Sequence, residues 1–264
     1  MRLRRLAVVA AACLGLFAGG AAARAADLAA HRAIYTLKLD TGKATDVQAA
    51  TGTMAYEVQD VCDGWATRQR LKMTVTNRDG QDVQMLSDYT TWESKDGLKL
   101  RFRTKQTTDQ TVTSDVAGEA TLEGAGAAGK ANFTSPEATS KDLAPGTLFP
   151  TSHTAALLKA AAEGKKFLAL PLFDGTSPEG AQDSSIVISG WGKAASGDRP
   201  ELKDLASGKF HIAFFNRGPE NQEPDYEVSM RYWENGVADD LMMNFGDFVM
   251  DGKLAEFALL PGKC

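Results

Sequence analysis

The residues of this sequence whose types and spacing could do chemistry are three cysteines, three histidines and two pairs of carboxylates. Cys13 lies in an apolar N-terminal stretch, and Cys62 and Cys264 lie about 200 residues apart in the remainder. Two thiols in an oxidising compartment commonly form a disulfide, which would here close a very long loop. Two free buried thiols and a disulfide-linked dimer are the alternatives that these residues leave open.

The histidines do not form a metal-binding pattern. His31, His153 and His211 lie far apart in the sequence, and none of them belongs to an H-E-x-x-H motif. With Cys62 and Cys264 committed to each other, a zinc site has no obvious ligands. We therefore expect no metal site, and we interpret His153, in the first turn of an expected helix, as a packed or hydrogen-bonding residue.

Motifs for nucleophilic catalysis are absent from the sequence. No serine lies in a G-x-S-x-G or an S-x-x-K motif. A hydrolase could use the carboxylate pairs Asp239 and Asp240 or Asp225 and Glu227. In strands the first pair points to opposite faces and the second pair to one face. Acidic residues beside turns are ordinarily exposed to solvent, so we expect no catalytic residues and a protein that is not an enzyme.

A glycine motif at positions 124–129 resembles the fingerprint of dinucleotide-binding proteins. The residues Gly124-Ala-Gly-Ala-Ala-Gly129 match G-x-G-x-x-G, which in such proteins precedes a helix. Only six residues separate Gly129 from Pro136, too few for that helix. We interpret the motif as a turn of small residues and expect no cofactor.

The N-terminal residues have the three parts of a secretory signal. Arginines precede a run of about 15 apolar or small residues, and Ala23-Arg24-Ala25 forms an A-x-A cleavage pattern. The run is too short to span a bilayer, so we expect cleavage after Ala25 and a soluble periplasmic product. An uncleaved anchor is one alternative, and lipidation at Cys13 is another. We expect one domain over residues 26–264, after a signal peptide over residues 1–25.

The charge of the expected product limits its partners. Without residues 1–25 the 29 basic residues become 25 against 34 acidic ones, which leaves a net charge near −9. Phosphate binding needs clustered lysine and arginine, so this balance argues against nucleic acid as a partner. It argues equally against tight binding to anionic lipid.

Alternation of apolar and polar residues predicts a protein built mainly of antiparallel strands. In one segment Trp65, Leu71, Met73 and Val75 share one face, and Arg68, Arg70, Lys72 and Thr74 share the other. Dipeptides such as Asp79-Gly80 and Asn235-Gly236 are typical of hairpin turns. The expected strands are His31–Leu39, Thr51–Gln59, Trp65–Thr76, Val83–Trp92, Leu98–Thr107, Phe167–Phe173, Ser185–Trp191, Lys209–Asn216, Asp225–Trp233, Asp240–Phe245 and Phe248–Leu260.

One helix is expected among these strands, over Thr154–Glu163. Thr151 or Ser152 could cap its start, and Gly164 marks its end. The helix is apolar or small on most sides, so we expect the curved sheet to wrap it and its concavity to be filled. We interpret residues 117–132 as a flexible hairpin or loose edge, and residues 174–183 and 196–201 as loops.

The four tryptophans have two interpretations. Trp65, Trp92, Trp191 and Trp233 could line an apolar ligand pocket. Large aromatic side chains are more commonly found in the core, and we expect these there.

Several motifs in order resemble the cell-envelope integrity protein EipB family over essentially the whole expected product. They are HRAIY at residues 31–35, VCDGW at 61–65, LAPGTLFPTSHT at 143–154, LFDG at 172–175, NGV at 235–237, FGDF at 245–248 and the terminal cysteine. The resemblance implies a periplasmic protein whose spiral antiparallel sheet wraps around a helix, as in the carriers LolA and LolB. It also implies a disulfide between Cys62 and Cys264.

The same resemblance implies a role in envelope integrity and stress resistance, and it supplies no catalytic residues. We expect a non-catalytic factor that contacts other periplasmic or envelope proteins. The alternative is a carrier that holds a lipid or lipoprotein acyl chain in the concave sheet, where apolar walls suit such a ligand.

Overall fold

The computed structural model describes residues 28–42, 47–193, 199–217 and 223–262. Within them, fourteen strands form one antiparallel sheet, and helix α1 (Pro150–Ala162) joins its two halves. The first half contains β1 (His31–Leu39), β2 (Val47–Asp60), β3 (Gly64–Asn77), β4 (Asp82–Ser94), β5 (Lys99–Thr108), β6 (Thr111–Leu122), β7 (Gly129–Ser135) and β8 (Thr139–Leu143). The second half contains β9 (Phe167–Leu172), β10 (Gln182–Lys193), β11 (Ala206–Asn216), β12 (Tyr226–Trp233), β13 (Ala238–Asn244) and β14 (Val249–Leu259).

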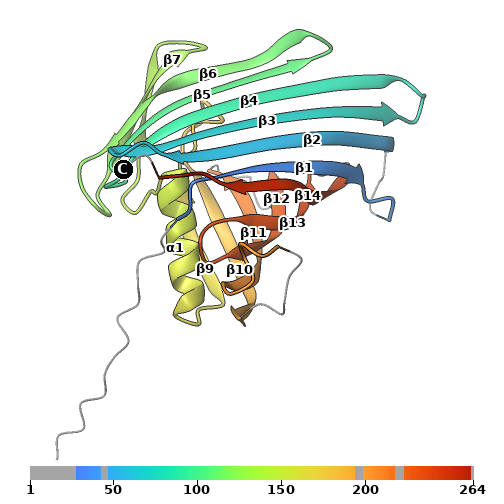
Figure 1. Ribbon diagram of the computed structural model, residues 1–264. Coiled ribbons are helices and arrows are strands. Elements are labelled where there is room, and N and C mark those ends of the chain that lie inside the picture. Colours follow the sequence, from blue (N-terminus) through green and yellow to red (C-terminus); the bar gives the residue numbers. More distant parts are fainter. Residues whose placement is uncertain (1–27, 43–46, 194–198, 218–222, 263–264) are drawn as a thin grey trace, which may run out of the picture.

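The sheet consists of two meanders joined in the middle by its first and last strands. Its order is β8-β7-β6-β5-β4-β3-β2-β1-β14-β13-β12-β11-β10-β9, so β1 pairs with β2 on one side and β14 on the other. Figure 1 shows β1 to β7 as a long curved layer, while the strands of the second half turn underneath it beside α1. The predicted fold class, a large curved antiparallel sheet with one helix, is confirmed.

The free edges of the sheet are brought together by the segment that precedes α1. Leu148 forms an isolated parallel bridge with Leu172 of β9. Its N–H donates to the Pro171 carbonyl, and its own carbonyl accepts from the Phe173 N–H, each at 2.9 Å. The chain that leaves β8 therefore returns to β9, which curls the sheet into a spiral.

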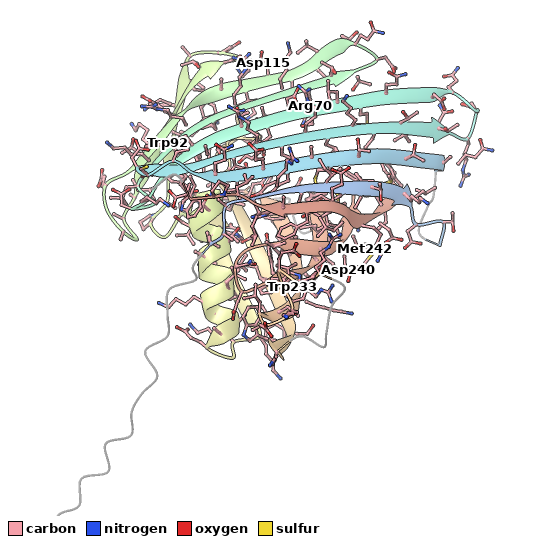
Figure 2. All side chains as sticks on the ribbon, in the orientation of Figure 1. Arg70, Trp92, Asp115, Trp233, Asp240 and Met242 are labelled. Carbon is pink, nitrogen blue, oxygen red and sulfur yellow. The ribbon has the colours of Figure 1, made fainter. Side chains whose placement is uncertain are left out.

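Alternation along the strands produces a buried inner face and a charged outer face. In β3, Leu71, Met73 and Val75 are buried while Arg68 and Arg70 are exposed, as the pattern predicts. Arg70 forms an ion pair on the outer face with Asp88 of β4 (Figure 2). The inner residues of the neighbouring strands and of α1 form the larger apolar core.

Residues 117–132 form the hairpin that was one of our two expectations, and the other expectation, a loose edge, is wrong. They belong to β6, a tight turn and β7, which pair with each other and with their outer neighbours β5 and β8. Ala120 and Ala131 are fully buried. A Cβ on Gly118 would lie 2.2 Å from the Asn132 carbonyl oxygen, so small residues allow the strands and side chains to approach closely here.

Helix α1 begins one turn earlier than expected, and its expected caps are wrong. The N-cap is Phe149, which offers no side-chain hydrogen bond, and Pro150 occupies the first turn. Thr151 and Ser152 therefore lie inside the helix. Its end agrees with the prediction, because Gly164 has a φ of 78° and its N–H donates to the Ala161 carbonyl.

The curved sheet covers the helix on one side only. Leu157 and Leu158 are 1 % and 2 % exposed and belong to the larger core, as expected. Lys159, Ala162 and Glu163 are exposed, so the helix lies at the margin of the sheet. The expectation of cover on nearly all sides is therefore wrong.

Candidate functional site

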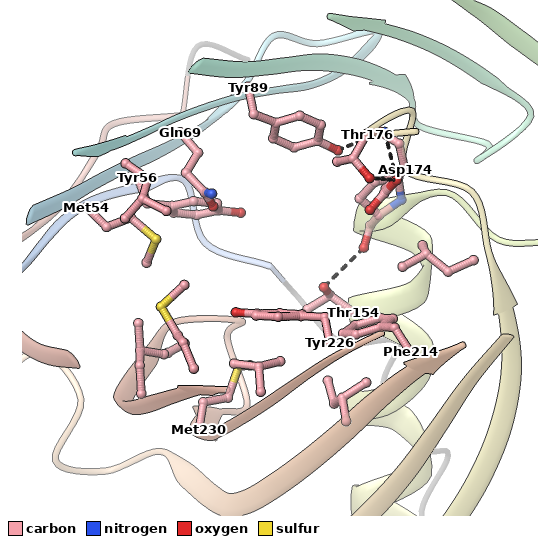
Figure 3. A pocket seen from close by; sticks show the side chains of 18 of the residues that line it. Met54, Tyr56, Gln69, Tyr89, Thr154, Asp174, Thr176, Phe214, Tyr226 and Met230 are labelled. Atoms are coloured by element: carbon pink, nitrogen blue, oxygen red, sulfur yellow. Dashed lines mark hydrogen bonds between the residues drawn. The ribbon is translucent and has the colours of Figure 1, made fainter. Parts of the chain in front are cut away.

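A cavity of about 510 Å³ lies between the two halves of the sheet. This volume is in the range of small-molecule sites in proteins. Strands β1 to β5 form one wall, β11 to β13 form the opposite wall, and α1 contributes Pro150, His153, Thr154 and Leu157 (Figure 3). The helix lines the concavity without filling it, so the expectation of a filled concavity is wrong.

The larger part of the cavity wall is apolar. It includes three methionines, whose flexible side chains adapt to different shapes. The aliphatic, methionine and phenylalanine residues are Met54, Leu71, Leu157, Leu172, Ile212, Phe214, Val228, Met230, Leu241, Met243 and Phe245. Alternation places them inside, because inward-facing positions of β2, β3 and β11 to β13 repeat every second residue. Such a surface suits an aliphatic chain.

Tyrosines add hydroxyl groups to this apolar wall. In Figure 3, Tyr56, Gln69 and Tyr226 point into the cavity from opposite sides. Burial raises the pKa of Tyr56 and Tyr226 far above the usual value, which keeps both phenols uncharged. Tyr89 donates from its hydroxyl to the Asp174 carbonyl at 3.0 Å. These groups can exchange hydrogen bonds with a neutral polar group.

Asp174 is a carboxylate in the wall, on the loop between β9 and β10. Its Oδ1 accepts hydrogen bonds from the N–H and the hydroxyl of Thr176, at 2.9 and 2.7 Å. Burial is the main cause that raises its pKa, and the bonds from Thr176 oppose the rise. Gly175 has a φ of 73°, and a Cβ there would lie 2.2 Å from Phe102, so only glycine lets the loop sit against β5.

Glu93 of β4 holds the N-terminus of α1 in place beside the cavity. Its Oε2 accepts from the Thr151 N–H at 2.7 Å, and its Oε1 accepts from the Ser152 N–H at 2.9 Å and from the Ser152 hydroxyl at 2.5 Å. Glu93 is 1 % exposed, and burial raises its pKa. The sequence did not reveal this cap, because Glu93 is 58 residues from Thr151.

The structure separates the three histidines. His153 lines the cavity and donates from Nε2 to the Ser184 hydroxyl at 2.8 Å, which in turn donates to a carbonyl. Burial lowers the pKa of His153 to about 4, so its imidazole is neutral at neutral pH. His31 also lines the cavity, and its Nδ1 lies 2.7 Å from the Ala29 carbonyl oxygen. His211 lies on β11 and forms hydrogen bonds with Ser229 and Glu227 of the neighbouring strand β12.

The two carboxylate pairs take part in ion pairs and hydrogen bonds with neighbouring residues. Asp239 is 7 % exposed and binds both Nε and Nη2 of Arg231 at 2.7 Å, so the expectation of solvent exposure is wrong for it. Asp240 pairs with Lys253 at 3.0 Å. Asp225 accepts from a backbone N–H, while Glu227 accepts from side chains on neighbouring strands. In the described part of the chain, no three His, Cys, Asp or Glu residues could hold a metal ion together.

None of the four tryptophans is among the described residues that line the cavity. Trp233 is fully buried in a small separate cluster, which agrees with the core interpretation. Trp65 and Trp92 are half-buried beneath cations, with Lys95 Nζ 3.5 Å from the Trp65 ring centroid. Trp191 is half-buried and packs edge-on against a phenylalanine of β11. The core interpretation therefore holds fully for Trp233 alone.

Of the two cysteines in the predicted disulfide, Cys62 is described and Cys264 lies outside the described residues. Cys62 occupies the turn between β2 and β3 with a φ of 71°. The Leu260 N–H donates to the Ala30 carbonyl, and the adjacent His31 pairs with Val58 near the end of β2. Strand β14 thus ends at the same end of the sheet as Cys62. The disulfide stays a prediction.

The fold and the cavity define a class of β-spiral proteins in which one open sheet curls around a ligand-sized space. The family described as EipB-like matches residues 22–261, and the chain belongs to this family. The cell envelope integrity protein EipB of Brucella abortus is 33 % identical over 253 residues, which cover 91 % of this chain and 88 % of that protein. The resemblance read from the motifs is therefore confirmed.

A solved structure gives the same result for the fold. The crystal structure of a beta-barrel-like protein from Brucella abortus superimposes with a TM-score of 0.79 and 29 % identity. The match covers 89 % of this chain and 99 % of the other. In the residues described here, no helix combines the length and the apolar character that a membrane crossing requires.

Proposed function

We propose that this chain is a non-catalytic periplasmic factor that supports the integrity of the cell envelope and its resistance to stress. The observation that carries the proposal is the match over 91 % of the chain to a cell envelope integrity protein. The signal-like N-terminal residues support a periplasmic location. Asp239 and Asp240 form ion pairs with Arg231 and Lys253, and Asp225 accepts a backbone hydrogen bond, so structural contacts account for these carboxylates and support a role without catalysis.

Two modes of action fit this role. In the first, the protein acts through its outer surface on other periplasmic or envelope proteins. In the second, it holds an acyl chain of a lipid or lipoprotein in the cavity. The cavity favours the second mode, because a space of about 510 Å³ with a mainly apolar wall has the size and character of a site for an apolar ligand.

The test of the envelope role is a strain that lacks the gene. We expect the deletion to increase sensitivity to detergents and to antibiotics that attack the cell wall, and the wild-type gene to restore resistance. Full resistance of the deletion strain to all these agents would contradict the proposal.

The test of the mode compares two matched substitutions in the complementing gene. Val228→Phe fills the cavity from β12, whereas Val187→Phe adds the same bulk at an exposed position of β10. If the cavity binds an acyl chain, only Val228→Phe should fail to restore resistance while the protein is still present in the periplasm. Restoration by both variants would favour the surface mode.

A further inference from the structure

The charged groups of the cavity wall have one sign. The lining contains no lysine and no arginine in the described part of the chain, whereas Asp174 and Asp225 both belong to it. The two histidines of the wall do not supply a positive charge at neutral pH, because burial lowers the pKa of both His31 and His153. Among the described residues, no side chain of the lining therefore offers a positive charge to an anion at neutral pH.

The N-terminus of α1 does not supply an anion site either. A helix N-terminus attracts anions through its free N–H groups. Here Pro150 has no N–H, and the N–H groups of Thr151 and Ser152 are bound by the Glu93 carboxylate. The Glu93 carboxylate thus already binds the free N–H groups at the positive end of the helix dipole, next to the cavity.

Asp174 can receive hydrogen bonds from a ligand. Its Oδ1 accepts the two hydrogen bonds from Thr176, whereas no other described residue donates a hydrogen bond to its Oδ2. Asp174 is half-buried, and it belongs to the cavity wall. Around the same space, Tyr56, Gln69 and Tyr226 offer groups that donate and accept hydrogen bonds (Figure 3).

We propose that the cavity binds amphiphiles whose polar end is uncharged or carries an amine, and that it discriminates against those that end in a carboxylate or phosphate. The inference rests on the proposed binding of an apolar chain in this cavity. A buried anion would lose its hydration without gaining a cation, and it would be repelled by Asp174. A hydroxyl, ester or amide finds partners in the tyrosines, and an ammonium group finds Asp174.

The experiment measures binding of dodecanol, dodecylamine and dodecanoate to the purified protein at neutral pH, by calorimetry below the concentrations at which they aggregate. The three compounds share one chain and differ in the head group. Both charged heads lose hydration on entry, so the ratio of amine to carboxylate affinity isolates the sign of the charge. We expect dodecanol and dodecylamine to bind at least about tenfold more tightly than dodecanoate.

A variant then tests the role of the carboxylate. Asp174→Asn should weaken dodecylamine several-fold and leave dodecanol nearly unchanged, so that the ratio of amine to carboxylate affinity falls. Asp251→Asn, which removes an exposed carboxylate from β14, is the matched control and should not change the ratio. If Asp174→Asn does not fold, the order of the three affinities for the wild-type protein alone tests the charge preference.

Three outcomes distinguish the proposed charge preference from the proposed binding of an acyl chain. Dodecanoate binding as tightly as dodecylamine, or an unchanged ratio in folded Asp174→Asn, would overturn the charge preference while leaving acyl binding in place. Absence of binding by all three compounds would refute acyl binding itself, and the inference would fall with it. The expected ranking together with the fall in Asp174→Asn would support both.

Discussion

Removal of the Glu93 carboxylate should loosen the N-terminus of α1. In Glu93→Ala, the N–H groups of Thr151 and Ser152 lose their acceptors in a place where Glu93 is 1 % exposed. Each buried N–H without a partner costs about 1 to 3 kcal/mol. Relief from burying a charge offsets part of this cost, since burial raises the pKa of Glu93. We expect a net loss of about 2 to 4 kcal/mol in the free energy of unfolding.

Glu93→Gln should cost about half as much, because the amide keeps one acceptor oxygen. The difference also depends on pH. Because the folded pKa of Glu93 lies above its ordinary value of 4.5, its contribution to stability is complete below that value and is lost as pH rises through the folded pKa. The deficit of Glu93→Gln relative to wild type should therefore shrink as pH rises from about 4 to 7.

The assay is urea denaturation followed by circular dichroism at several pH values. Glu119→Ala on β6 is the control, because Glu119 is an exposed strand carboxylate whose loss should change stability by no more than about 0.5 kcal/mol. Equal stability of Glu93→Ala and Glu119→Ala would refute the reasoning. A deficit of Glu93→Gln that grows with pH would refute the pH argument alone.

Three further predictions concern the helix, a histidine and the disulfide. Leu157→Ala and Leu158→Ala should each lower the free energy of unfolding by about 2 to 5 kcal/mol, as measured by urea denaturation. If neither substitution changes this free energy, the helix packs loosely. Because the pKa of His153 falls to about 4, its contribution is present above pH 6.5 and lost as pH drops toward 4. His153→Asn should flatten that pH dependence by up to about 3 kcal/mol, and an unchanged profile would contradict it. Non-reducing peptide mapping should find Cys62 linked to Cys264, and Cys264→Ser should lower the free energy of unfolding by about 2 to 5 kcal/mol. Reaction of both thiols with a labelling reagent in the native protein would contradict the disulfide.

Strands with large alternating residues could be predicted from the sequence. In β3, Leu71 and Met73 face the core while Arg70 and Lys72 face outward, and the hairpin glycines set the turns. Strands β6 and β7 escaped prediction because their inner positions include Ala120 and Ala131. Small residues give a weak alternation, although close approach of neighbouring side chains requires them.

The candidate site could be predicted only in part. The apolar inward positions were visible in the sequence, but the pattern is the same whether the space between them is filled or open. That difference depends on the curvature of the sheet and on where α1 packs. Glu93 was missed because its partner Thr151 is 58 residues away, and a charged residue within a strand gives no local signal. Asp174 was missed because a loop carboxylate gives no sign that the fold places it in a cavity wall.

The pairing of β1 with β14 has a consequence for the time course of folding. During synthesis, β1 is complete more than 200 residues before its partner β14 exists. Until then, β1 can pair only with β2, so the edge that will face β14 has no partner. Pairings between residues so distant in sequence form slowly. The edge of β1 that later pairs with β14 is therefore exposed to aggregation until β14 is in place.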